Sequence, residues 1–140
     1  MPKMIFINLP VRDLARATAF YQAIGAVKNP QFSDDTASCM VFSDTIHSML
    51  MTHDKYRQFT SRTIADPKTT SQVLLCISAD SRAEVDDVVG KAGAAGGVVD
   101  PSPVDEYDFM YGRSFEDPDG HLWGVNWMDM AAFEKAMAPG

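Results

Sequence analysis

The chain has 140 residues, 46% of them hydrophobic, which is enough for one domain with a substantial core. Its formal net charge of −7 argues against nucleic acid or an anionic membrane as a partner, because both would repel it. No apolar run approaches the roughly 20 residues of a membrane span, and the N-terminal residues lack the layout of a signal peptide. We therefore expect a cytoplasmic protein in which Cys39 and Cys76 are reduced core residues, with a disulfide or metal pair as the alternative.

The first half of the chain begins with a strand and a helix. Residues 4–11 alternate as a strand does, and Phe6 and Asn8 share one of its faces. Asp13 is a good N-cap for a helix whose apolar residues recur at helical spacing, and Gly25 is a natural residue to end it. These features predict a strand followed directly by an amphipathic helix.

A hairpin and a long connection come next. Residues 37–42 and 47–52 are apolar runs separated by turn residues, which favours two antiparallel strands. A further short strand is expected at 31–33. Residues 55–70 are polar and mixed, which is typical of a loop that crosses between two halves of a molecule.

The pattern then restarts in the second half of the chain. Residues 72–78 predict a strongly apolar strand, and Ser81 and Glu84 have the spacing of a capping box at the start of a helix. Valine and alanine residues at helical spacing give that helix an apolar stripe, and a glycine-rich stretch ends it. Three more strands are predicted, at 98–99, 109–115 and 122–128.

A strand, a helix and three strands thus occur twice, offset by about seventy residues. This repeat predicts an α+β fold in which two βαβββ modules form a curved mixed sheet around a central cup. The whole chain, residues 1–140, would be a single domain. Its parts would be two modules at about 4–54 and 71–128, a crossover at 55–70 and a C-terminal helix at 129–138.

The turn between the last two strands is the most distinctive stretch. Residues 117–120 read Asp-Pro-Asp-Gly, in which proline and the Asp-Gly pair suit successive positions of a tight reversal. In the strand that follows, Trp123 lies on one face, whereas Gly124 and Asn126 lie on the other. Since a glycine inside a strand often marks the close approach of a ligand or a backbone, we expect the second face to look onto the cup.

Three short motifs, together with the doubled strand and helix order, resemble a known superfamily. The motifs are Leu-Pro-Val-Arg-Asp-Leu at 9–14, Phe-Tyr at 20–21 and Phe-x-Asp-Pro-Asp-Gly-x-x-Trp at 115–123. They resemble the vicinal oxygen chelate (VOC) superfamily, which includes glyoxalase I, bleomycin resistance proteins, fosfomycin resistance transferases and extradiol dioxygenases. The resemblance implies the glyoxalase-like fold. It does not imply one function, because this scaffold hosts unrelated chemistries and non-enzymes.

The resemblance also implies a divalent metal in the cup, held by His or Glu on the first, fourth, fifth and eighth strands. In this chain those positions fall on Phe6, Leu50, Val73 (or Gln72, with the strand shifted by one residue) and Gly124. These side chains offer at most one weak amide donor, so we expect neither a metal nor another cofactor. The three histidines lack a recognised ligand spacing and are expected at the surface or at loop ends: His47, His53 and His121.

The residues expected to bind a ligand in the cup are mostly apolar or neutral. Tyr111 and Arg113 share a face of their strand and could stack on a ligand or bind its carboxylate. In the alternative, Phe6 and Leu50 only fill the cup as core, and Tyr111 and Arg113 are a solvated pair at a strand edge. The full set is Phe6, Asn8, Leu50, Gln72, Tyr111, Arg113, Gly124 and Asn126.

Three functions are compatible with these residues. The leading one is a glyoxalase-like or bleomycin-resistance-like protein that binds a small organic molecule in the cup without the family's metal. The second is a metal-dependent enzyme, either a lyase similar to lactoylglutathione lyase or an extradiol dioxygenase. The third is a structural homodimer with a filled cup. No catalytic residue is assigned, because neither cysteine has an adjacent base.

A homodimer is expected chiefly because members of the resembled superfamily pair in this way. The sequence adds that the C-terminal helix carries apolar residues such as Met130 and Phe133, and that it is too short to be stable alone. We therefore expect this helix to pack near the dimer interface.

Overall fold

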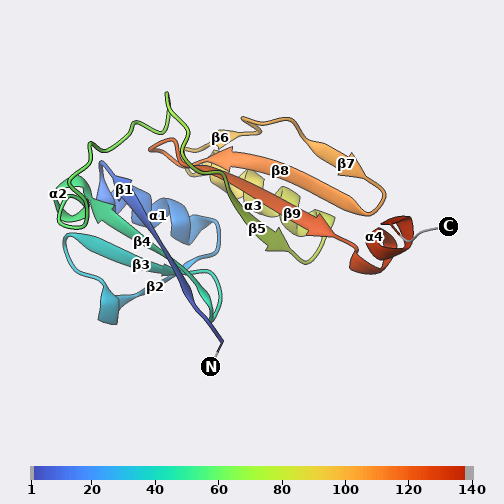
Figure 1. Ribbon diagram of the computed structural model, residues 1–140, viewed down its shortest axis with the longest axis horizontal. Helices are drawn as coiled ribbons and strands as arrows, with labels where there is room; N and C mark the ends of the chain where they lie inside the picture. The colour runs from blue at the N-terminus through green and yellow to red at the C-terminus, as the bar shows by residue number, and fades with distance from the viewer. Residues whose placement is uncertain (1, 138–140) are drawn as a thin grey trace.

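The computed structural model describes residues 2–137 and has the expected α+β architecture, with two βαβββ-type modules side by side (Figure 1). The first module consists of β1 (Ile5–Val11), α1 (Leu14–Ala23), β2 (Val27–Asn29), the 3-10 helix η1 (Pro30–Phe32), β3 (Ala37–Val41) and β4 (Ile46–Thr52). Its sheet has the order β1-β4-β3-β2, with β1 and β4 parallel. Asp13 caps α1 as expected, because its carboxylate accepts a hydrogen bond from the backbone N–H of Arg16 at 3.0 Å.

The second module repeats this plan after a crossover that starts with α2 (His53–Tyr56). It consists of β5 (Leu75–Ala79), α3 (Arg82–Ala94), β6 (Val98–Val99), β7 (Asp105–Tyr107), β8 (Met110–Glu116) and β9 (Leu122–Met128). Its sheet has the order β5-β9-β8-β6, and β7 also pairs with β8. Ser81 caps α3 as expected, since its hydroxyl oxygen accepts from the backbone N–H of Glu84 at 3.0 Å.

Several elements differ from the expected ones, among them β2, for which no strand was expected. Residues 31 and 32 of the segment expected as a strand at 31–33 belong to η1. Pro30 and the Asn29 side chain, which accepts from the Gln31 N–H at 3.0 Å, favour this helical turn. The strand expected to start at Gln72 starts instead at Leu75. Strand β7 escaped prediction because all its residues are exposed, so its sequence has no apolar alternation.

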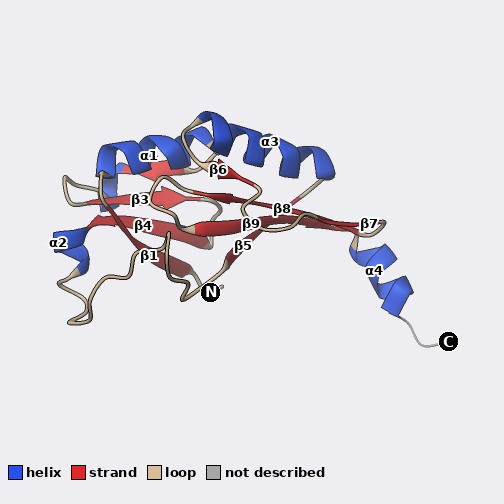
Figure 2. Cartoon of the chain, turned by 90° about the horizontal axis from the view of Figure 1, so that it is seen from above, coloured by secondary structure: helices blue, strands red, loops and turns tan. Residues whose placement is uncertain are grey.

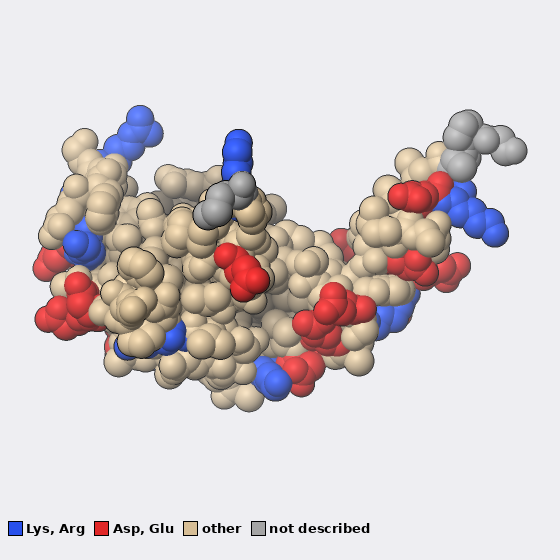
Figure 3. Space-filling view, turned by 90° about the horizontal axis from the view of Figure 1, so that it is seen from below, with Lys and Arg blue, Asp and Glu red and all other residues tan. Residues whose placement is uncertain are grey.

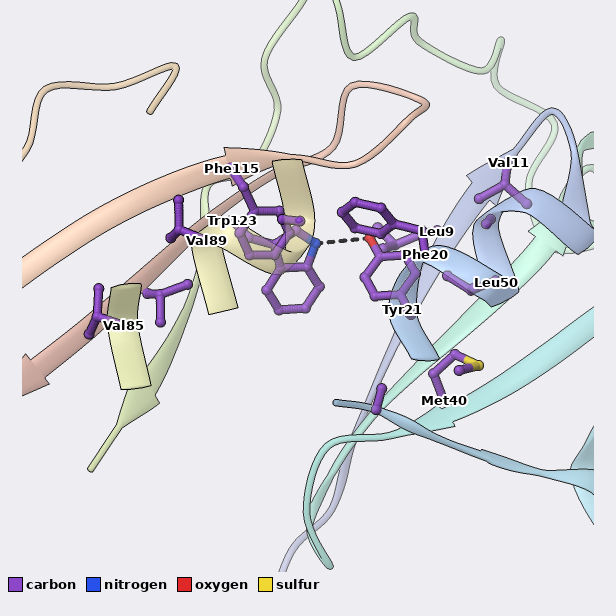
Figure 4. Close-up of a cluster of buried hydrophobic side chains, with 14 residues drawn as sticks. Leu9, Val11, Phe20, Tyr21, Met40, Leu50, Val85, Val89, Phe115 and Trp123 are labelled. Atoms are coloured by element: carbon purple, nitrogen blue, oxygen red, sulfur yellow. Dashed lines mark hydrogen bonds between the residues drawn. The ribbon is translucent and has the colours of Figure 1, made fainter. Parts of the chain in front are cut away.

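Both long helices cover the same side of the two sheets (Figure 2), and the core lies between helices and strands (Figure 4). It includes Phe20 and Tyr21 of α1, Leu50 of β4, and Phe115 and Trp123 of the second module, each at most 2% exposed. The opposite side of each sheet, which neither α1 nor α3 covers, is the open face of its module (Figure 2). The two modules therefore share one core, although each has its own hydrogen-bonded sheet.

The C-terminal helix α4 (Met130–Met137) projects away from the sheets (Figures 1 and 2). Asp129 caps it by accepting from the Ala132 N–H at 3.0 Å, and Phe133 packs on Phe109 with ring centroids 5.6 Å apart. Residue 138 of the expected helix lies outside the described part of the chain. None of the helices between residues 2 and 137 is long and apolar enough to cross a membrane.

Candidate ligand-binding site

A cavity of about 390 Å³ lies where the two modules meet. Its walls come from the end of β1, the crossover, the start of β5 and the turn between β8 and β9. The polar side chains that line it include Asn8, Arg62, Gln72, Glu116 and His121. This volume lies within the usual range for sites that hold a small molecule.

The Asp-Pro-Asp-Gly turn shapes one wall of the cavity. The Asp117 carboxylate accepts hydrogen bonds from the backbone N–H groups of Asp119 at 3.0 Å and His121 at 2.9 Å. Gly120 has a φ of +102°, a conformation that an L side chain rarely adopts. The turn is thus held from inside by its first residue, and it presents His121 to the cavity.

Three hydrogen bonds connect this turn to the first module. The Tyr21 hydroxyl donates to Asp117 at 2.6 Å, and the backbone N–H of Arg12 donates to Asp119 at 2.8 Å. His121 Nε2 lies 2.8 Å from the carbonyl oxygen of Pro10. The turn motif therefore holds the two modules together, in addition to reversing the chain. We call the turn and its three partners, Pro10, Arg12 and Tyr21, the clasp.

The contact with Pro10 assigns the tautomer of His121. A carbonyl oxygen only accepts hydrogen bonds, so Nε2 must carry a proton. In the neutral ring, Nδ1 is then a hydrogen-bond acceptor. The cavity consequently gains an imidazole whose orientation is set by the backbone of the other module.

Burial changes the pKa values of the clasp. Desolvation raises the pKa of the Asp117 carboxyl, and the Tyr21 pKa is raised by the same burial and by the neighbouring Asp117 charge. One carboxylate oxygen of Asp119, Oδ2, is buried without a hydrogen-bond partner among the described residues. These polar groups lie inside the protein, where they connect the modules rather than face a ligand.

On the open face of the first module, the structure corrects the expected position of Leu50. This residue is fully buried and pairs with Leu9 in the core, so it faces the helix side. Met49 is the residue that pairs with Asn8 on the open side. Because strand side chains alternate, the assigned position was one residue out of register.

Phe6 lies on this open face, half exposed, and stacks on His47 with ring centroids 4.6 Å apart. His47 was expected at the surface but is only 7% exposed, and its Nδ1 is buried without a hydrogen-bond partner in the described part of the chain. The Phe6 ring thus shields His47 from solvent, and it does not line the cavity at the module junction.

Gly124 and Asn126 lie on the open face of β9, as expected. The Asn126 amide donates to the Cys76 thiol at 2.7 Å, and glycine at 112 leaves the space that the amide oxygen occupies. Cys76 is exposed on this face, which corrects the expectation that it is a core residue, whereas Cys39 is buried. Burial of its sulfur still raises the Cys76 pKa, so the thiol form is favoured.

Tyr111 and Arg113 face away from the cup, contrary to their expected role. The Tyr111 hydroxyl donates to Asp86 of α3 at 2.6 Å. Arg113 donates to Asp86 at 3.0 Å and to Asp100 at 2.7 Å. Tyr111 and Arg113 do share one face of β8, as expected, but α3 covers that face.

Of the expected ligand residues, the structure therefore brings Asn8 and Gln72 together at the cavity. Sequence reasoning missed Arg62, Glu116 and His121, which also line it. Glu116 and His121 flank the turn motif, so their sequence position carried a usable signal. Arg62 lies in the crossover, where no periodic pattern indicates which side chains point inward.

The family pattern's metal positions do not fit a metal in this chain. Phe6, Val73 and Gly124 offer no donor, and Leu50 lies in the core. Within residues 2–137, no group of three or more His, Cys, Asp or Glu side chains is placed to hold a metal ion.

Comparison with known proteins identifies relatives over nearly the whole chain. A family model described as "Glyoxalase/Bleomycin resistance protein/Dioxygenase superfamily" matches residues 3–125. Hypothetical protein SA1046 from S. aureus is 25% identical and has a TM-score of 0.74; the match covers 91% of this chain and 95% of that one. A glyoxalase/bleomycin resistance protein/dioxygenase family enzyme from Burkholderia phytofirmans PsJN is 22% identical, with a TM-score of 0.72 and coverage of 91% and 99%.

A more distant likeness is to the fosfomycin resistance protein FosX from Mesorhizobium loti. It is 16% identical with a TM-score of 0.68, and the match covers 95% of this chain and 98% of that one. At this identity the likeness shows the fold alone. A comparison with curated proteins found no match.

Proposed function

The chain belongs to the glyoxalase/bleomycin resistance protein/dioxygenase superfamily, and on that basis we propose that it binds a small organic molecule in the cavity between its modules. The observation that carries the proposal is the cavity itself. It has about 390 Å³ of space, and neutral polar groups such as Asn8 and Gln72 line it. Polar side chains that converge on a concave surface are typical of sites that orient a small ligand.

The proposed binding does not use the family's metal. The side chains at the pattern's metal positions support this part of the proposal, because Phe6, Val73 and Gly124 offer no donor to an ion. The competing function is a metal-dependent lyase or dioxygenase. Metal analysis of protein purified without chelator separates the two: near-stoichiometric zinc, nickel, manganese or iron that survives dialysis would overturn the metal-free proposal.

Ligand binding is tested by a thermal-shift screen of small organic molecules with a variant that blocks the cavity. Ser71 is exposed and lines the cavity, so Ser71→Trp fills space there without disturbing the core. Ser43→Trp is the matched control, since Ser43 is also exposed but lies in the turn between β3 and β4. A ligand at a hundred times its Kd should stabilise the wild type by about 2.7 kcal/mol.

We expect the stabilisation to disappear in Ser71→Trp and to persist in Ser43→Trp. Ligands whose effect survives in both variants bind elsewhere and would count against this cavity. If no compound in a broad screen stabilises the wild type, the proposal fails and a structural role with a filled cup is favoured.

The proposal also includes a cytoplasmic homodimer. The two cysteines are free, as thiols are in a reducing compartment. Among the described residues, helix α4 packs on its own chain chiefly through the pair formed by Phe133 and Phe109, and a second copy would give it a further surface to pack on.

A further inference from the structure

The charged side chains of the cavity are one arginine and one glutamate. Arg62 comes from the crossover and Glu116 from the end of β8. The described residues that line the cavity include no other Arg, Lys, Asp or Glu. Glu116 pairs across the sheet with Leu122, which also lines the cavity, so both lie on the same face.

Neither charge is neutralised within residues 2–137. The neighbouring hollow is lined by Arg12 and Arg57 as well as by Arg62. Arg12 pairs with Asp66 at 3.7 Å and Arg57 with Asp54 at 3.0 Å. The side chains of Arg62 and Glu116, by contrast, take part in none of the ion pairs or side-chain hydrogen bonds of the described residues. The cavity thus carries a positive and a negative group that are both available.

Two available charges of opposite sign constrain the ligand. A carboxylate on the ligand would pair with the guanidinium of Arg62, which suits a planar oxyanion in two-point contact. A protonated amine would pair with the carboxylate of Glu116. A ligand with only one charge makes one of these two contacts, and it leaves the other protein group to the solvent.

Resting on the proposed function, we propose that the cavity binds a zwitterion of the amino-acid class. Its carboxylate contacts Arg62, its ammonium group contacts Glu116, and neutral groups such as Asn8 and Gln72 bind the remainder. A zwitterion has no net charge, so its binding leaves the net charge of the protein at −7.

Four compounds with the same phenyl group test the proposal: phenylalanine, 3-phenylpropionate, 2-phenylethylamine and 3-phenylpropionamide. Isothermal titration at pH 7 should give phenylalanine the lowest Kd. We expect each of the other three to bind at least about fivefold more weakly, since each loses one or both charge contacts. Equal affinity for any of them and phenylalanine would overturn the proposal.

Two charge-neutralising variants assign the contacts. Arg62→Gln should weaken phenylalanine and 3-phenylpropionate about fivefold and leave 2-phenylethylamine unchanged. Glu116→Gln should weaken phenylalanine and 2-phenylethylamine and leave 3-phenylpropionate unchanged. Arg57→Gln is the matched control, because Arg57 lines only the neighbouring hollow, and it should alter none of the affinities. If either variant weakens all the compounds to the same extent, whatever their charge, the assignment of the carboxylate to Arg62 and of the ammonium group to Glu116 is contradicted.

Two outcomes separate a cavity without a preference for zwitterions from a cavity that binds no small molecule. If neutral 3-phenylpropionamide binds as well as phenylalanine and Ser71→Trp blocks both, the cavity binds small molecules and only the zwitterion inference falls. If none of the four compounds binds, the zwitterion inference falls; the broad screen then decides the proposed function separately.

Discussion

The hydroxyl of Tyr21 donates a 2.6 Å hydrogen bond to the carboxylate of Asp117, 96 residues further along the chain. The same hydroxyl accepts from the indole N–H of Trp123 at 3.0 Å (Figure 4). Tyr21 is fully buried and belongs to α1 of the first module, whereas its two partners belong to the second. This one phenol therefore couples the packing of the modules to the turn that shapes the cavity.

Tyr21→Phe should destabilise the protein by about 1–3 kcal/mol, because it leaves a buried carboxylate oxygen and a buried indole N–H short of a partner. The aromatic ring is retained, so the loss reports on the hydroxyl alone. Urea unfolding at pH 7, followed by tryptophan fluorescence, measures the change in the free energy of unfolding.

Tyr111→Phe is the matched control for that measurement. Its hydroxyl also donates to an aspartate at 2.6 Å, but the partner, Asp86, has a side chain that is 55% exposed. Water can replace that bond, so we expect a loss well below that of Tyr21→Phe. Equal losses of unfolding free energy in the two variants would contradict the inference that burial makes the Tyr21 hydroxyl contribute more to stability than the Tyr111 hydroxyl.

The sequence predicted the fold well because its signals are local. Alternation identified β9 with its correct bounds, and the capping residues Asp13 and Ser81 marked both long helices. The site was harder to predict, because it depends on which face of each strand the helices cover. An error of one residue in β4 moved Leu50 to the wrong side, and the shared face of Tyr111 and Arg113 was assigned to the cup.

Gly120→Ala should destabilise the protein more than Gly25→Ala. Both glycines have φ near +100°, at +102° and +109°, so each substitution strains the backbone by roughly 1–2 kcal/mol. At Gly25 an added Cβ meets nothing in the described chain within 4 Å, whereas at Gly120 it would press on Lys68 of the crossover. The excess loss in Gly120→Ala, measured by thermal or urea unfolding, reports on packing between the turn and the crossover. Identical losses would contradict that contact.

The ion pairs of Arg113 predict how stability depends on acid. A hydrogen bond from Arg113 is the main reason why the pKa of Asp100 is below its usual range. A carboxyl with a lowered folded-state pKa stabilises the fold above its unfolded value, about 3.9, and this contribution is lost as pH falls through the lowered pKa. Asp100→Asn should therefore cost stability at pH 7, and the difference from wild type should shrink as pH falls below about 4.

Asparagine is the suitable replacement at this position. Asp100 has a φ of +51°, which asparagine tolerates, so the backbone contributes little to the difference. Arg113→Gln removes the partner instead and should show the same convergence with wild type in acid. A difference between Asp100→Asn and wild type that stays constant from pH 7 to pH 2 would contradict the role of this pair.

Helix α4 is the element through which we expect the proposed dimer to form. In Figure 3 this end of the molecule rises away from the body, and Asp and Glu side chains gather near its base. Met130 and Met137 of α4 are 56% and 67% exposed. An eight-residue helix with exposed apolar side chains is not stable alone, so we expect it to be buried in an isologous dimer of twice the 15.4 kDa chain mass.

Met130→Glu should weaken that dimer and leave the unfolding of the monomer unchanged, because the side chain is already exposed in the single chain. Val27→Glu is the matched control: Val27 is 66% exposed but lies on β2 of the other module. Light scattering across micromolar concentrations, with both variants, measures the effect. A monomeric wild type would refute the dimer. If Met130→Glu and Val27→Glu dimerise equally tightly, the two copies pair through a surface other than α4.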